Sequence, residues 1–158
     1  MVRPRRAATT ALIGSGATIT GFYGFLIGEA MLARRAIGTS DERPPSPDGV
    51  YGDDLPGRPI RLLVIGDSAA VGYGMTSADA TPPAMLGIGL AHVMDAPVEV
   101  RSRAVVGAQT SELMQQIAEV GDWEPHVAVI VIGTNDVTHQ VPPGTSARQL
   151  GDVVRHLV

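Results

Sequence analysis

The stretch VIGDSAAVGYG, residues 64–74, contains residue types that an acyl-transfer enzyme needs. An apolar run ends at Gly66, and an acid, Asp67, and a hydroxyl residue, Ser68, follow it. A serine hydroxyl can attack a carbonyl carbon when a base takes its proton. The same letters also fit a strand that runs into a turn, with Asp67 capping the next helix. Ser68 is therefore a candidate nucleophile whose assignment depends on the other loops of the chain.

Two further loops follow strand-like runs and carry groups that complement Ser68. PVEVRSRAV leads into VGAQTS, which contains Gly107, and VAVIVIG leads into TNDVTH, which contains Asn135. Ligands of open parallel sheets bind beyond the carboxyl ends of the strands, so we expect the three loops to converge there. The N–H groups of Ser68 and Gly107 and the side-chain amide of Asn135 could then hold a developing oxyanion. Gly107 has no Cβ to obstruct that approach.

These blocks resemble those of the SGNH hydrolases, also called GDSL-type esterases and lipases. GDS at residues 66–68 matches the first block, with Ser68 in the nucleophile position and Ala69 where Leu is usual. Gly107 matches the oxyanion glycine of the second block, and Asn135 in GTND matches the oxyanion asparagine of the third. The resemblance runs from about Arg61 to the C-terminus.

The resemblance implies a flavodoxin-like three-layer α/β/α fold in which the second strand is an edge. It also implies hydrolysis of an acyl or acetyl ester through an acyl-enzyme on Ser68, with no metal and no cofactor. The implied substrates are small-molecule, lipid or carbohydrate esters. Asp67 is expected to shape the turn that holds the serine rather than to take part in the chemistry.

The general base is the part of the machinery that this sequence does not supply convincingly. In the family, a fourth block, Asp-x-x-His, provides the base and the acid that orients it. DVTH at residues 136–139 has that spacing, but it directly follows Asn135, whereas the family's dyad comes from a later loop. We therefore predict that Asp136 supports its loop by hydrogen bonding and that His139 lines the cleft. His139 as the base is the alternative.

Hydrophobic periodicity predicts an α/β domain with a parallel sheet over residues 60–158. The continuous apolar runs IRLLVIG and VAVIVIG predict strands buried on both faces, and the alternation in PVEVRSRAV predicts an edge strand. Helical patterns cover residues 83–95, 110–120 and 146–158. A flavodoxin-like sheet has about five strands, so we expect this domain to be truncated at its C-terminus, with the base beyond Val158.

The N-terminal part has a different composition. Residues 7–28 are uncharged and follow three arginines, Arg3, Arg5 and Arg6. As a helix they would span about 33 Å, enough for a bilayer core. We predict a signal-anchor or transmembrane helix within residues 1–37, with a cleaved signal peptide and a soluble helix as alternatives. Residues 38–59 are rich in Pro, Gly and acids and are predicted to be a flexible linker. The arginines favour an extracytoplasmic hydrolase domain, secreted if the segment is cleaved.

Composition excludes several classes of function. The net charge is −4 and the basic residues form no stripe, so we expect no nucleic-acid partner. The chain has no Cys, which excludes disulfides and thiolate catalysis, and its four His residues lack metal-ligand spacing, so no metal site is predicted. Three hypotheses remain: a membrane-anchored serine esterase, a truncated non-catalytic pseudo-hydrolase tethered to the membrane, and a nucleotide-binding domain. The last is disfavoured because no G-x-G-x-x-G opens a helix.

Overall fold

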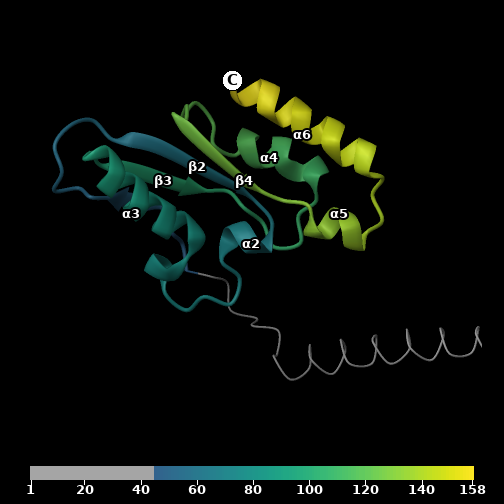
Figure 1. The fold of residues 1–158 in the computed structure, drawn as a ribbon, viewed down its shortest axis with the longest axis horizontal. Coiled ribbons are helices and arrows are strands. Elements are labelled where there is room, and N and C mark those ends of the chain that lie inside the picture. Colours follow the sequence, from purple (N-terminus) through teal and green to yellow (C-terminus); the bar gives the residue numbers. More distant parts are fainter. Residues whose placement is uncertain (1–44) are drawn as a thin grey trace, which may run out of the picture. The chain divides into compact units, whose positions relative to one another are not determined.

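A four-stranded sheet forms the centre of the structure, a computed structural model that describes residues 45–158 (Figure 1). In spatial order the strands are β1 (Gly49–Tyr51), β3 (Val98–Ser102), β2 (Ile60–Gly66) and β4 (Val127–Val131). β2 pairs in parallel with β3 and with β4, whereas β1 runs antiparallel to β3. The carboxyl ends of β2, β3 and β4 therefore lie at one edge of the sheet.

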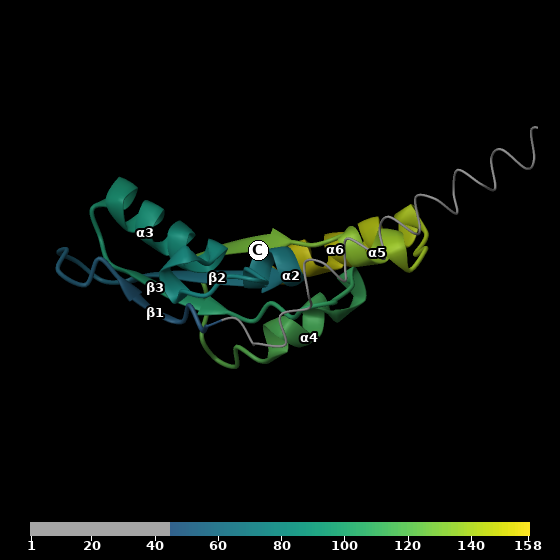
Figure 2. The same ribbon diagram turned by 90° about the horizontal axis from the view of Figure 1, so that it is seen from below.

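Helices cover both faces of this sheet (Figure 2). On one face lie α2 (Ser68–Val71), the short 3-10 helix η1 (Ala78–Ala80) and α3 (Pro82–Met94). On the other face lie α4 (Leu113–Ala118), which continues from the 3-10 helix η2 (Thr110–Glu112), and α6 (Pro143–Leu157). α5 (Thr134–Thr138) follows β4 almost directly. This arrangement confirms the predicted α/β class.

The core is divided between the two faces by the alternation of side chains along β2. Leu62 and Val64 pack toward α3, with Val98 and Val100 of β3 beside them. Leu63 and Ile65 pack on the opposite side, against α4 and α6. All four β2 side chains are at most 1% exposed, which confirms that this apolar run is a strand buried on both faces.

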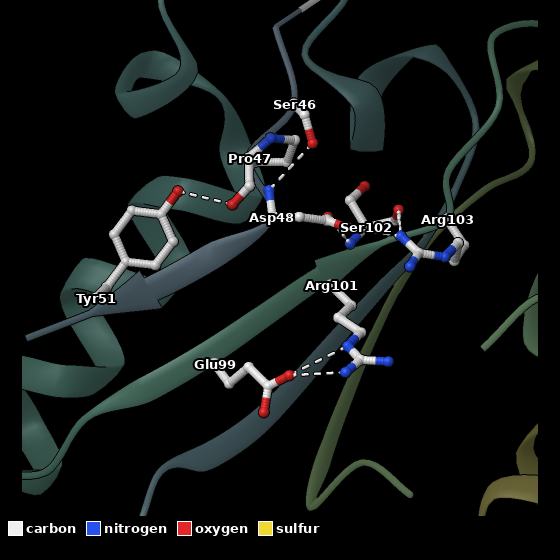
Figure 3. Close-up of polar contacts among 8 residues, drawn as sticks. All are labelled: Ser46, Pro47, Asp48, Tyr51, Glu99, Arg101, Ser102 and Arg103. Carbon is white, nitrogen blue, oxygen red and sulfur yellow. Dashed lines mark hydrogen bonds and ion pairs between the residues drawn. The ribbon is translucent and has the colours of Figure 1, made fainter. Parts of the chain in front are cut away.

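The stretch from residue 45 to 59 differs from the flexible linker that the sequence predicts over residues 38–59. It contains β1, and the residues just before β1 bind the end of β3 (Figure 3). The Asp48 carboxylate accepts hydrogen bonds from the Ser102 N–H and the Arg103 guanidinium, each at 2.7 Å. The Tyr51 hydroxyl donates to the carbonyl of Pro47 at 2.8 Å. A strand of three residues amid turn-forming residues leaves no periodicity for the sequence to reveal.

β1 also corrects two predictions about the sheet. The sheet is mixed rather than purely parallel, and β3 is not an edge strand, because β1 covers its outer side. The alternation in β3 has another cause, since Glu99 and Arg101 lie on its partly solvated face and pair with each other at 3.0 Å (Figure 3). Within the described residues β4 lies at an edge, so Val127 and Val131 are each 39% exposed rather than buried.

The predicted anchor within residues 1–37 lies outside the described residues, so it stays a prediction. The same holds for residues 38–44 of the predicted linker. From residue 45 onward, no helix has both the length and the apolar character needed to cross a membrane.

Gly66, the last residue of β2, is where the chain turns out of the sheet. Its φ of 143° is one that side-chain-bearing residues rarely adopt, and a Cβ built there would lie 1.9 Å from the carbonyl oxygen of Val131. The next N–H, that of Asp67, donates to the same oxygen at 3.0 Å. The Val131 carbonyl at the end of β4 therefore leaves no room for a side chain at Gly66, in the turn that leads to Ser68.

We expect Gly66→Ala to lower the free energy of unfolding by about 2 kcal/mol or more, because both the steric contact and the φ value oppose a side chain. Urea denaturation followed by circular dichroism measures this. Gly49→Ala is the matched control, since its added Cβ meets nothing within 4 Å. Equal stability of the two variants would contradict this view of the turn.

Candidate active site

Ser68 is the first residue of α2, immediately beyond the carboxyl end of β2. Asp67 caps this short helix by accepting a hydrogen bond from the Ala69 N–H at 2.9 Å. The helix ends after one turn, because Gly72 adopts a left-handed conformation and donates its N–H to the Ser68 carbonyl. The Ser68 side chain is half-buried. The sharp strand-to-helix turn therefore holds Ser68 at the edge of the sheet where the parallel strands end.

A buried glutamine that the sequence analysis missed holds the turn before Ser68. Gln116 of α4 accepts a hydrogen bond from the Gly66 N–H at 2.8 Å and donates its side-chain amide to the Gly66 carbonyl at 2.9 Å. Gln116 is only 2% exposed. Its position three residues after Leu113 and four before Val120 places it on the buried face of the helix, which is the signal that could have identified it.

The loop after β3 carries Gly107. Its φ is 86°, and a Cβ there would meet no atom within 4 Å, so its backbone borders open space. The loop is tied to the Ser68 turn, because the Val105 N–H donates to the Gly66 carbonyl at 3.0 Å. Among the described residues, no backbone hydrogen bond between loops uses the Gly107 N–H.

Asn135 lies in α5, after the carboxyl end of β4, and its side chain reaches the Gly107 loop. Its amide nitrogen donates to the Ala108 carbonyl at 2.9 Å. A primary amide has two N–H groups, so one remains for another acceptor. This bond joins Asn135 to Ala108, the residue that follows Gly107.

Asp136 makes a second connection between the same two loops. Its buried carboxylate accepts hydrogen bonds from the Thr110 N–H at 3.0 Å and from the Thr110 hydroxyl. Burial alone would raise the pKa of Asp136. The two Thr110 hydrogen bonds, with smaller contributions from Ser146 and His139, outweigh burial and leave the pKa below its ordinary value. Asp136 is therefore a charged carboxylate whose hydrogen bonds go to Thr110, three residues after Gly107.

The Asp-x-x-His spacing of residues 136–139 does not form a catalytic dyad here. The Asp136 oxygens are bonded to Thr110, and His139 Nδ1 lies 2.8 Å from the Asn135 carbonyl oxygen instead. His139 is exposed and caps the end of α5. Among residues 45–158, no hydrogen bond joins Ser68 to any histidine.

The other histidines have surroundings unrelated to Ser68. His126 accepts the Arg61 N–H at 3.0 Å, at the opposite end of β2, and His92 and His156 are exposed on α3 and α6. Over the described range, no cluster of three or more His, Asp or Glu side chains suited to a metal ion is present. The groups available for chemistry at the edge where β2, β3 and β4 end are thus a hydroxyl, backbone N–H groups and a side-chain amide.

Known proteins with related sequences and structures share this architecture. A model of the GDSL-like lipase/acylhydrolase family matches residues 64–158. The GDSL-like esterase Rv1075c of Mycobacterium tuberculosis is 35% identical over 98% of this chain, which covers 54% of that protein. The chain thus spans about half the length of this curated relative.

Solved structures agree with the sequence matches. AlinE4, an SGNH-hydrolase family esterase, superposes on 65% of this chain and 55% of its own with a TM-score of 0.56 and 26% identity. TesA has the same fold, with a TM-score of 0.55 at 22% identity over 61% of this chain and 53% of its own. The family match covers more than half of the chain and includes the Ser68, Gly107 and Asn135 loops. This chain therefore belongs to the GDSL-like lipase/acylhydrolase family, the SGNH hydrolases.

Proposed function

We propose that the protein is a serine ester hydrolase that works through an acyl-enzyme on Ser68. The observation that carries this proposal is the pairing of the Gly107 and Asn135 loops, through Asn135 to Ala108 and Asp136 to Thr110. This pairing supports the proposal, because it joins the two segments from which we expect the oxyanion donors, at the edge of the sheet where Ser68 lies. The relatives that carry the word esterase in their names support the same class of reaction.

In the proposed mechanism the Ser68 oxygen bonds to the ester carbonyl carbon while a base takes the hydroxyl proton. The N–H groups of Ser68 and Gly107 and the Asn135 amide stabilise the tetrahedral oxyanion. When the carbon–oxygen bond to the alcohol breaks, the protonated base returns the proton to the leaving alkoxide. Water, deprotonated by the same base, then attacks the acyl carbon, the bond to Ser68 Oγ breaks, and the base returns the proton to the serine as the acid leaves. No metal or cofactor takes part.

We propose that the general base is none of the four histidines of this chain. His139 is bonded to its own helix, and Asp136 is engaged by Thr110. The curated relative is about twice as long as this chain, which leaves room in such a protein for a later dyad. A non-catalytic pseudo-hydrolase would also account for the lack of a histidine bonded to Ser68 among residues 45–158, but the relatives named as esterases favour the hydrolase. The substrate proposed is a small-molecule, lipid or carbohydrate ester of an acyl or acetyl group.

Ser68→Ala tests the nucleophile. We expect the full-length protein to react covalently with a fluorophosphonate probe and the variant to lose that labelling, because the probe's phosphorus is attacked by an activated serine oxygen. In-gel fluorescence and peptide mass spectrometry measure it. Ser77→Ala, at an exposed position, is the control and should label normally. Equal labelling of wild type and Ser68→Ala would refute the proposal.

His139→Ala tests the neighbouring histidine. Since His139 is exposed and makes no hydrogen bond to Ser68 among the described residues, we expect less than about a threefold change in kcat/KM for a p-nitrophenyl ester. Loss of a true general base costs on the order of a hundredfold or more. A drop of that size, with unchanged circular dichroism, would make His139 the base and overturn this assignment.

Asp136→Asn tests the connection between the loops. The pKa of Asp136 is lower in the folded state, so its carboxylate stabilises the fold above the unfolded-state pKa, and that stability is lost as the pH falls through the folded-state pKa. We expect the variant to lose about 1–2 kcal/mol at pH 7 and to show a flatter decline in stability toward acid pH. Denaturation at several pH values measures both. Asp122→Asn, exposed in a loop, should change neither, and an unchanged Asp136→Asn profile would disprove the role.

A further inference from the structure

We infer that Gln116 is a positioning residue for Ser68. Two hydrogen bonds from one buried side-chain amide hold both backbone groups of Gly66, two residues before the serine. This inference rests on the proposed function of Ser68, and it adds a residue that lies on α4 rather than on any of the loops with the reacting groups.

The backbone of Gly66 explains why a side chain is needed there. In the sheet, β2 exchanges hydrogen bonds with β3 and β4, but at Gly66, whose φ is 143°, both the N–H and the carbonyl bond to the Gln116 side chain of α4. A buried N–H without a partner is costly. The side-chain amide of Gln116 satisfies the N–H and the carbonyl of Gly66 as a neighbouring peptide group would, because it has one acceptor and one donor in a single plane.

The geometry leaves little freedom at this junction. The Gly66 carbonyl also accepts the Val105 N–H at 3.0 Å, and the Asp67 N–H binds the Val131 carbonyl. Gly66 is therefore bound by α4, by the Gly107 loop and by the end of β4 together. Of these contacts, the one from α4 is made by a side chain, so substitution can remove it without altering a strand or a loop.

A misplacement of the reacting oxygen by about 1 Å can slow a reaction roughly a hundredfold. We therefore expect Gln116→Met, which removes both bonds at similar volume, to slow fluorophosphonate labelling of Ser68 by about tenfold to a hundredfold. The neighbouring Gln115 is exposed on the same helix, so Gln115→Met is the matched control and should label like the wild type. Thermal melts identify any variant that fails to fold.

Gln116→Glu supplies a readout that simple loss of packing would not produce. A protonated carboxyl group can accept from the Gly66 N–H and donate to the Gly66 carbonyl, whereas the carboxylate repels that carbonyl oxygen. Burial raises the pKa of such a group, so labelling relative to wild type should recover as the pH falls. Gln115→Glu should show no such recovery. A constant ratio across pH would count against positioning by hydrogen bonding.

Deuterium exchange of the peptide backbone separates failure of this inference from failure of the proposed function. In Gln116→Met the amides around residues 66–68 should exchange faster than in Gln115→Met, whether or not the probe labels Ser68. If exchange is faster in Gln116→Met but the wild type is not labelled at all, Ser68 is not the nucleophile. The hydrogen bonds between Gln116 and Gly66 would then have no role in catalysis. Normal labelling and unchanged exchange in Gln116→Met would overturn the inference itself.

Discussion

Hydrogen bonds from buried or partly buried side chains hold together the three loops that follow the parallel strands. Gln116 binds Gly66 before Ser68, Asn135 binds Ala108 beside Gly107, and Asp136 binds Thr110. Each bond joins segments at least 26 residues apart in the chain. Strand pairing alone fixes only where the loops begin. The path of each loop beyond that point depends on these side chains, and so does any chemistry that requires the loops to act together.

The bonds differ in how they respond to their surroundings. Those of Gln116 and Asn135 involve neutral amides and are insensitive to pH. That of Asp136 involves a carboxylate whose pKa is held down by Thr110, so it weakens only under acid conditions. If the proposed mechanism holds, the oxyanion donors stay aligned over the pH range in which a histidine base would be neutral. The hydrogen bonds that connect the loops would then not depend on the protonation state of the base.

The apolar runs and the GDS and GTND blocks were sufficient to predict β2, the α/β class and the edge of the sheet beyond which Ser68, Gly107 and Asn135 each follow a strand. β1 was not predicted because a strand of three residues is too short to show a hydrophobic periodicity. Without β1 in the predicted sheet, β3 was assigned to an edge. The spacing of Gln116 to Leu113 and Val120 indicates that it is buried, but its partner is a backbone group 50 residues away, which no local pattern reveals. The position of Asp136 after Asn135 was enough to predict that it supports its loop by hydrogen bonding. Its partner, Thr110, was not predicted, because it is 26 residues away in the chain.

The central claim is that Ser68, Gly107 and Asn135 surround one acyl carbon. A crystal structure of the full-length protein with a phosphonate bound covalently to a serine tests it most directly, because the phosphonyl oxygen occupies the position of the oxyanion. We predict that the phosphorus is attached to Ser68 Oγ and that this oxygen lies within about 3 Å of the Ser68 and Gly107 N–H nitrogens and of Asn135 Nδ2. A phosphonyl oxygen directed to solvent, or a phosphonate on another serine, would contradict the account.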